Sequence, residues 1–214
     1  MTKKTDFALL DPKTAFGKPQ SHLLDPNYQD LFTHIDIYDL PDYDLTVHKC
    51  LVIAGLVDQE FLYKQKEQIR HFLDQKKLLV FCGNLFRPWL PGGSNFVPKT
   101  IRHYTDYQVL IHQPHPIFAG VHPDDMTYNK GVAGFFARGH HPTPPGAEVL
   151  LTLAGGEPIT YIDRNSTRGT ILVHSGGDLF GYFFPGKSTG RIAIQLIDWV
   201  RDEYRQLQER GDSV

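Results

Sequence analysis

Cysteine is scarce in this sequence: only two of the 214 residues, Cys50 and Cys82, are cysteines. Two cysteines are too few for the disulfide framework that stabilises many small secreted proteins, so a reducing environment is expected. Residues 1–6 carry positive charge, but the apolar segment of a signal peptide does not follow them. No uninterrupted apolar run is long enough to cross a bilayer. We therefore expect a cytoplasmic protein that has no membrane partner.

An excess of charge is also missing, because 22 Lys and Arg residues are balanced by 24 Asp and Glu residues. The net charge of −2 does not indicate a basic surface, so no nucleic-acid partner is expected. No cofactor is predicted either. A chain of this length can bury a sizeable core. We therefore expect one domain over residues 1–214. The sequence leaves open whether copies of this domain assemble into a homo-oligomer.

The first half of the chain contains a strand–helix–strand pattern. Apolar runs at residues 51–54 and 78–81 show no polar alternation, which predicts strands covered on both faces of a sheet. Between them, apolar residues recur at helical spacing over residues 59–74. Such a unit implies a right-handed parallel crossover. We therefore predict an α/β fold, a flavodoxin-like three-layer sandwich with a mostly parallel sheet.

Further elements complete this expectation. A tight Gly155–Gly156 connection predicts a late antiparallel hairpin or edge. Residues 83–146 are rich in Gly, Pro and His and predict an irregular excursion that caps the edge of the sheet. An amphipathic helix opens near Ser188, and residues 207–214 are expected to form a frayed tail. A helix is predicted to start at residues 25–26, and the remaining strands are expected at residues 7–10, 34–38, 107–112, 148–153, 158–162 and 169–174.

Two chemically reactive residues end predicted buried strands: Cys82 ends one, and His174 ends another. The carboxyl ends of parallel strands meet at one edge of a sheet, where open α/β sheets bind ligands. A Cys–His pair at that edge could act as nucleophile and base. The alternatives are a small buried cysteine and a histidine satisfied by backbone groups. The residues expected to line a ligand site there are Gly55, Gly83, Asn84, Arg87, Trp89, Ser175 and Asp178.

The chain resembles the class I glutamine amidotransferase-like superfamily in the order of these segments. The pattern is a strand ending at Gly55, a helix, a strand ending at Cys82–Gly83, and a late strand ending at His174. The most similar branches are those without amidotransferase activity, especially the ThuA-like proteins. The resemblance covers residues 34–200. It implies that Cys82 takes the nucleophile position, His174 the histidine position, and Gly55 a place near the oxyanion-side loop.

The chain departs from the family pattern at three positions. The family has small residues two before and two after the nucleophile, where this chain has Val80 and Asn84. The family's glutamate, two residues after the histidine, corresponds to Gly176. We therefore favour a degenerate domain that binds a small, sugar-like ligand or a protein partner near Cys82. The alternative is a Cys–His hydrolase or transferase acting on a small amide or ester, with an oxyanion held by backbone amides near Gly55 and Gly83.

Residues 181–188 match the Walker A pattern G-x-x-x-x-G-K-[ST]. In a true P-loop, backbone amides cradle phosphates and Lys187 would reach them. The intervening residues are bulky and apolar, and no later strand supplies a Walker B aspartate, so phosphate or nucleotide binding is a remote alternative. A weaker hypothesis is that Lys187, Ser188 and the helix N-terminus bind an anion.

Several histidines gather in the irregular middle of the chain, but no spacing matches a known metal motif, and no metal is predicted. These are His112, His115, His122, His140 and His141. In the same region, Arg87 and Trp89 follow Cys82 closely. They could wall a pocket, because Trp stacks well on sugars and bases, or Trp89 could be packed under a loop.

Overall fold

The computed structural model describes residues 5–14 and 26–210. Eight strands of the described residues form one sheet in the order β2-β1-β3-β4-β10-β9-β8-β6. Their bounds are β1 Phe7–Asp11, β2 Phe32–Asp36, β3 Cys50–Ala54, β4 Leu78–Cys82, β6 Val109–Ile111, β8 Glu148–Leu153, β9 Pro158–Asp163 and β10 Thr170–His174. Two short strands, β5 Val97–Pro98 and β7 Gly139–His140, pair separately.

The first five strands of this order, β2-β1-β3-β4-β10, are parallel. This is the flavodoxin-like arrangement, and it confirms the predicted fold class. All residues of β3, β4 and β10 are buried, as their apolar runs predict. The sheet then continues through β9, β8 and β6 in antiparallel pairs. The expected hairpin at Gly155–Gly156 joins β8 to β9, and the Gly156 N–H donates to the Leu153 carbonyl at 2.8 Å.

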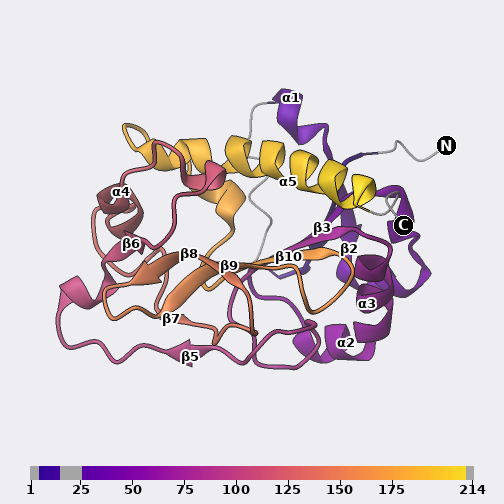
Figure 1. Cartoon of the computed structure of the whole chain (residues 1–214), viewed down its shortest axis with the longest axis horizontal. Coiled ribbons are helices and arrows are strands. Elements are labelled where there is room, and N and C mark those ends of the chain that lie inside the picture. Colours follow the sequence, from indigo (N-terminus) through magenta and orange to yellow (C-terminus); the bar gives the residue numbers. More distant parts are fainter. Residues whose placement is uncertain (1–4, 15–25, 211–214) are drawn as a thin grey trace.

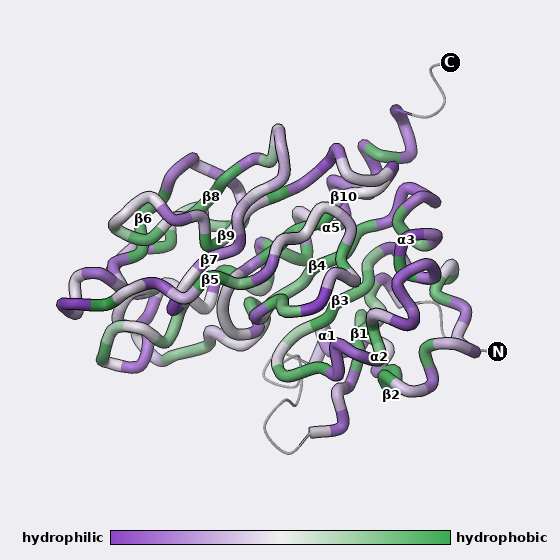
Figure 2. Tube along the Cα trace, turned by 90° about the horizontal axis from the view of Figure 1, so that it is seen from below, coloured by the Kyte–Doolittle hydropathy of each residue, from purple (hydrophilic) through white to green (hydrophobic). Residues whose placement is uncertain are grey.

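Helices cover both faces of the sheet and complete three layers. The long helix α5, Arg191–Glu209, lies on one face, while α2, Gln59–Lys64, and α3, Lys66–Asp74, lie on the other (Figure 1). Figure 2, which views the molecule from below, shows hydrophobic residues along β1, β3 and β4. The other α-helices of the described residues are α1, Pro26–Gln29, and α4, Pro123–Thr127.

A buried ion pair fastens α5 to the sheet. Glu203, which is 3% exposed, accepts hydrogen bonds from Arg164 Nε at 2.6 Å and Nη2 at 2.9 Å. The Thr170 hydroxyl, on β10, donates to the same carboxylate at 2.8 Å. These bonds satisfy a charge that would otherwise be costly to bury. They fix α5 relative to the strand that carries His174.

Several element boundaries differ from the sequence-based expectation, and one of them is set by a side-chain cap. The expected strand at 34–38 ends at Asp36, whose carboxylate accepts from the Tyr38 N–H at 3.0 Å and starts a 3-10 turn. The expected helix over 59–74 is interrupted at Gln65. The expected strand at 107–112 shortens to Val109–Ile111. Pro26 begins α1, and Asp25 lies outside the described residues.

The frayed tail predicted for residues 207–214 is corrected for its first three residues. Helix α5 continues through Glu209, and Leu207 is only 7% exposed. The apolar stripe of the helix therefore extends one turn further than the sequence suggested. Among the described residues, no helix is both long and apolar enough to cross a membrane.

Candidate functional site at the carboxyl edge of the sheet

Cys82 and His174 lie side by side at the carboxyl edge of the sheet. They are register partners on the adjacent parallel strands β4 and β10, so their side chains leave the same face. That face is the one covered by α5, where Cys82 packs with Val80 and Leu172. Both residues are 0% exposed. The two predicted catalytic residues are thus neighbours, but both are sealed from solvent.

The thiol of Cys82 is in an environment that disfavours its charged form. Burial raises the pKa of the Cys82 thiol well above its usual value, and the nearby Asp178 carboxylate raises it further. The one favourable contact for a thiolate is the Leu179 backbone N–H. Among the described residues, no hydrogen bond joins Cys82 to His174, so nothing there draws the proton from the thiol.

His174 is held as a neutral ring. Its Nδ1 lies 2.8 Å from the Thr160 hydroxyl, and burial lowers its pKa to about 3. The ring of Phe136 packs on it edge-to-face with centroids 4.8 Å apart. Its Nε2 lies against the backbone of Phe136 and Gly176 and forms no hydrogen bond of good geometry within the described part of the chain. His174 Nε2 is therefore a buried polar atom without a hydrogen-bond partner among the described residues.

The backbone amides expected to hold an oxyanion have partners inside the sheet. The Gly83 N–H donates to the His174 carbonyl at 3.0 Å, and the Gly55 N–H donates to the Cys82 carbonyl at 3.0 Å. Cys82 itself is paired on both sides as a regular strand residue. A nucleophile elbow would instead place it on a sharp, strained turn. The only described non-glycine residues with positive φ are Lys13 and Lys76.

The loop after β4 is organised by Gln59, the first residue of α2. Its Oε1 accepts from the Phe86 N–H at 3.0 Å, the Arg87 N–H at 3.3 Å and the Trp89 indole N–H at 3.3 Å. Its Nε2 donates to the Asn84 carbonyl at 2.7 Å. This side chain replaces the backbone partners that an irregular loop lacks.

Trp89 does not wall a pocket, which corrects the expectation for it. It is 1% exposed and packs edge-on against Phe81, with ring centroids 5.2 Å apart. Arg87 is exposed and forms an ion pair with Glu60 on α2. Asn84 is also exposed. Of the three residues Asn84, Arg87 and Trp89, only Asn84 and Arg87 are open to solvent.

A segment of the excursion packs over His174 and joins the residues after β10. Of those residues, Asp178, Leu179 and Tyr182 lie near Cys82. Ala137 forms a bridge with Gly176, and the Tyr182 hydroxyl donates to the Phe136 carbonyl at 3.4 Å. A Cβ at Gly176 would lie 1.9 Å from the Phe136 carbonyl oxygen. Only glycine allows this approach. We call Phe136, Ala137 and His141 the cover.

His141 connects the cover to both strands of the site. Its Nε2 accepts from the Leu85 N–H at 3.0 Å, so its Nδ1 carries the proton and donates to the Ser175 hydroxyl 2.8 Å away. Burial, and secondarily His140, lower its pKa to about 4. The sequence pattern groups His141 with the loop histidines and does not indicate this role. An aromatic residue within a Gly-rich loop, Phe136, is the available signal that part of this segment is buried.

The anion site expected at Lys187 and Ser188 contains a carboxylate of the chain itself. Asp125 Oδ2 accepts from the Ser188 N–H at 2.9 Å and from its hydroxyl at 2.6 Å, and Lys187 lies 3.2 Å from Oδ1. These contacts lower the pKa of Asp125 to about 2. The Walker-like segment therefore binds α4 internally. Asp178, also expected in the ligand site, caps a 3-10 turn by accepting from the Phe180 N–H at 3.0 Å.

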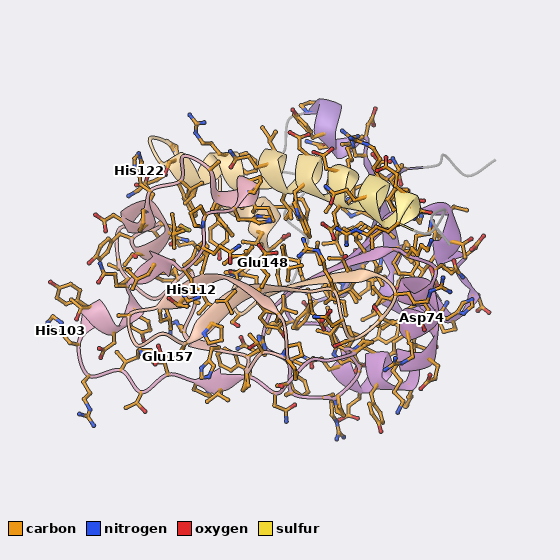
Figure 3. The ribbon with its side chains drawn as sticks, viewed as in Figure 1. Asp74, His103, His112, His122, Glu148 and Glu157 are labelled. Carbon is orange, nitrogen blue, oxygen red and sulfur yellow. The ribbon has the colours of Figure 1, made fainter. Side chains whose placement is uncertain are left out.

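The other histidines do not converge. Figure 3 shows His103, His112 and His122 at separate places on the molecule. His115 packs against Trp199, and its Nδ1 accepts from the N–H two residues on. Within residues 5–14 and 26–210, no group of three or more His, Cys, Asp or Glu side chains could hold a metal ion.

The fold is a flavodoxin-like α/β sandwich, and comparison with solved structures finds a similar fold in a glutamine amidotransferase. A glutamine amidotransferase from Thermotoga maritima matches 97% of this chain and 86% of its own, with 12% identity and a TM-score of 0.50. An exo-beta-1,4-mannosidase from Opitutaceae bacterium strain TAV5 matches all of this chain with 12% identity and a TM-score of 0.49, but the chain spans only 36% of its length.

These likenesses concern the fold alone. No family model matches the chain, and no curated protein matches its sequence. The narrower resemblance to ThuA-like proteins stays a prediction.

Proposed function

We propose that this protein is a non-catalytic module with the amidotransferase-like fold, and that it acts by binding at the carboxyl edge of its sheet. The observation that carries the proposal is the enclosure of Cys82. A nucleophilic cysteine needs a thiolate and an open path to its substrate. Cys82 has a raised pKa and no solvent exposure.

The rest of the amidotransferase-type machinery is also lacking around this thiol. The amides of Gly55 and Gly83 are already bonded to strand carbonyls. The position of the family's acidic residue is Gly176, where even a methyl group would collide with the cover. Each of these features supports a packed interior around Cys82 rather than a catalytic site.

The binding surface that we propose lies beside the sealed pair, on the loops after β2, β3 and β4. These loops leave three large apolar side chains open to solvent: Tyr38 at 52%, Leu56 at 67% and Phe86 at 59% exposure. Exposed apolar residues at a ligand-binding sheet edge are typical of an interaction surface. Because side chains of the chain itself enclose Cys82, a protein partner suits this edge better than a sugar buried beside the thiol.

The test is the reactivity of the two thiols in the native protein. Iodoacetamide should label Cys82 roughly a hundredfold more slowly than a free thiol at neutral pH, because labelling must wait for an opening of the structure. Labelling after unfolding, followed by mass spectrometry, gives the reference, and Cys50→Ser assigns the signal. Labelling of native Cys82 at the rate of a free thiol or faster would overturn the proposal.

The Cys–His hydrolase or transferase keeps one supporting observation, the direct register of Cys82 with His174. It requires the cover to lift so that substrate reaches the pair. Hydrolysis of glutamine or of a small ester that is lost in Cys82→Ser would establish this function in place of the binding module.

A further inference from the structure

A second site is suggested by a cavity at the opposite edge of the sheet from β2. The cavity has a volume of about 560 Å³, which is in the range of small-molecule sites. It is lined mainly by apolar side chains, those of Ile111, Pro114, Pro116, Phe118 and Ala119. All the lining residues belong to one run of chain, from the last residue of β6 to the loop before α4. Figure 1 shows β6 and α4 at the same end of the molecule.

The walls of this cavity are held in place without a ligand. Pro114 and Pro116 restrict the backbone, and the Phe118 N–H closes a turn on the His115 carbonyl at 3.0 Å. On the α5 side, Gln195 donates to the Ala119 carbonyl at 2.9 Å. A preformed apolar cavity binds a ligand at a lower entropic cost than one that must be ordered.

The polar side chain that lines the cavity is His115, and Arg191 lies next to the lining residue Gly120. His115 accepts at Nδ1 from the Ile117 N–H, which leaves Nε2–H as its donor in the neutral ring. Arg191, the first residue of α5, is exposed, and its Nη1 lies 3.7 Å from where a Cβ would stand at Gly120, a lining residue. Within the described part of the chain, Arg191 forms no ion pair or hydrogen bond.

The surroundings of Arg191 do not neutralise its charge. The first turn of α5 contains no acidic residue. In the turn just before the helix, the Ser188 N–H and hydroxyl donate to Asp125 and not to a group beside Arg191. An unpaired guanidinium at the start of a 19-residue helix is a favourable place for an anion, because the helix dipole adds to its charge.

We propose that this cavity binds a small apolar carboxylic acid. The apolar body packs against Ile111, Pro116 and Phe118, and the carboxylate pairs with Arg191. A neutral apolar molecule would leave the guanidinium unused, and a bare inorganic anion would leave the apolar walls unfilled. The site is separate from Cys82, so it stands independently of the role proposed for the carboxyl edge.

The test compares hexanoate with hexanol on the full chain by NMR titration of backbone amides. Hexanoate should shift the amides of Ile111, Ala119 and Gly120 and bind about tenfold or more tightly than hexanol, the size expected for a charge-assisted pair. Arg191→Ala should lower the affinity for hexanoate to that for hexanol. Arg70→Ala, which removes an exposed arginine on α3, should leave both affinities unchanged.

Two results would overturn the proposal. One is that hexanoate binds no better than hexanol to the wild type. The other is that hexanoate shifts amides away from the cavity and Arg191→Ala binds it as the wild type does. Because Arg191 is exposed, a thermal melt should show that the variant folds normally.

Discussion

Gly176 is the residue at which the cover approaches the sheet most closely. We expect Gly176→Ala to lower the free energy of unfolding by about 2–3 kcal/mol, the usual cost of overpacking a rigid site. The physical reason is the 1.9 Å separation between the added methyl group and the Phe136 carbonyl oxygen. Because this collision displaces the cover, the rate of Cys82 labelling should rise as well. Urea unfolding and iodoacetamide labelling measure the two effects.

The neighbouring Gly177 provides the matched control. A methyl group there would meet only the end of the Tyr182 side chain, at 3.2 Å. Gly177→Ala should therefore cost much less stability and leave Cys82 protected. If the two variants behave alike, the contact between Gly176 and the cover has no special importance.

His141 makes stability depend on acidity. Its folded-state pKa of about 4 is below the value of 6.5 for a free histidine, so the unfolded chain binds a proton first as the pH falls. The contribution of the neutral ring is complete above pH 6.5 and decreases between pH 6.5 and 4, by on the order of 3 kcal/mol in total. His141→Asn should reduce the slope of stability against pH in that window by about 1.4 kcal/mol per pH unit.

Urea unfolding at a series of pH values between 7 and 4 measures this slope. Exposed His112 provides the control, and His112→Asn should leave the slope unchanged. His174, whose pKa is also lowered by burial, continues to titrate in both variants. An unaltered slope in His141→Asn would show that His141 is not buried as a neutral ring.

At the residue scale, the sequence could indicate Cys82 and His174 but not their state. Each ends an apolar run, and that local pattern is enough to place both at the carboxyl edge. The environment that decides their chemistry is assembled from distant segments: His141 bonds Leu85, 56 residues away, and Ser175, 34 residues away. No periodicity or motif encodes such contacts, so the sealing of the thiol could not be predicted.

At the scale of elements, Gln59 joins α2 to the loop after β4. Gln59→Ala should destabilise the protein by about 2–3 kcal/mol, because the buried Trp89 indole N–H and the part-buried Phe86 N–H would lose their acceptor. Glu60→Ala, on the same helix, removes only an exposed ion pair and should change stability by less than about 1 kcal/mol. Thermal unfolding of both variants measures the difference, and equal melting temperatures would contradict the role given to Gln59.

The elements that the sequence located best are those defined by uninterrupted apolar runs. Strands β3, β4 and β10 lie within one residue of their expected bounds, because burial on both faces leaves a clear pattern. The observed bounds differ from the expected ones where a polar side chain forms a hydrogen bond to the backbone, as the Asp36 carboxylate does at the end of β2. The Walker-like segment could not be interpreted from its sequence for the same reason, because its partner, Asp125, is distant along the chain.

At the scale of the whole molecule, the parallel half of the sheet followed from the sequence, and the closure of its edge did not. The order β2-β1-β3-β4-β10 results from crossovers that handedness constrains strongly. The antiparallel half and the excursion are joined by contacts with no local signature, such as the bridge between Ala137 and Gly176. The likeness to a glutamine amidotransferase therefore extends to the fold, while the chemistry at its edge depends on those late contacts.

The two cysteines can report how the molecule opens. Cys50 and Cys82 are both fully buried in the same core, but only Cys82 lies at the edge that the cover closes. If the cover opens without unfolding the sheet, Cys82 should be labelled faster than Cys50, with a weaker dependence on urea, because a smaller surface is exposed. Labelling each thiol in the variant that lacks the other separates the two rates. Equal rates with equal dependence on urea would show that the cover and the sheet unfold as one unit.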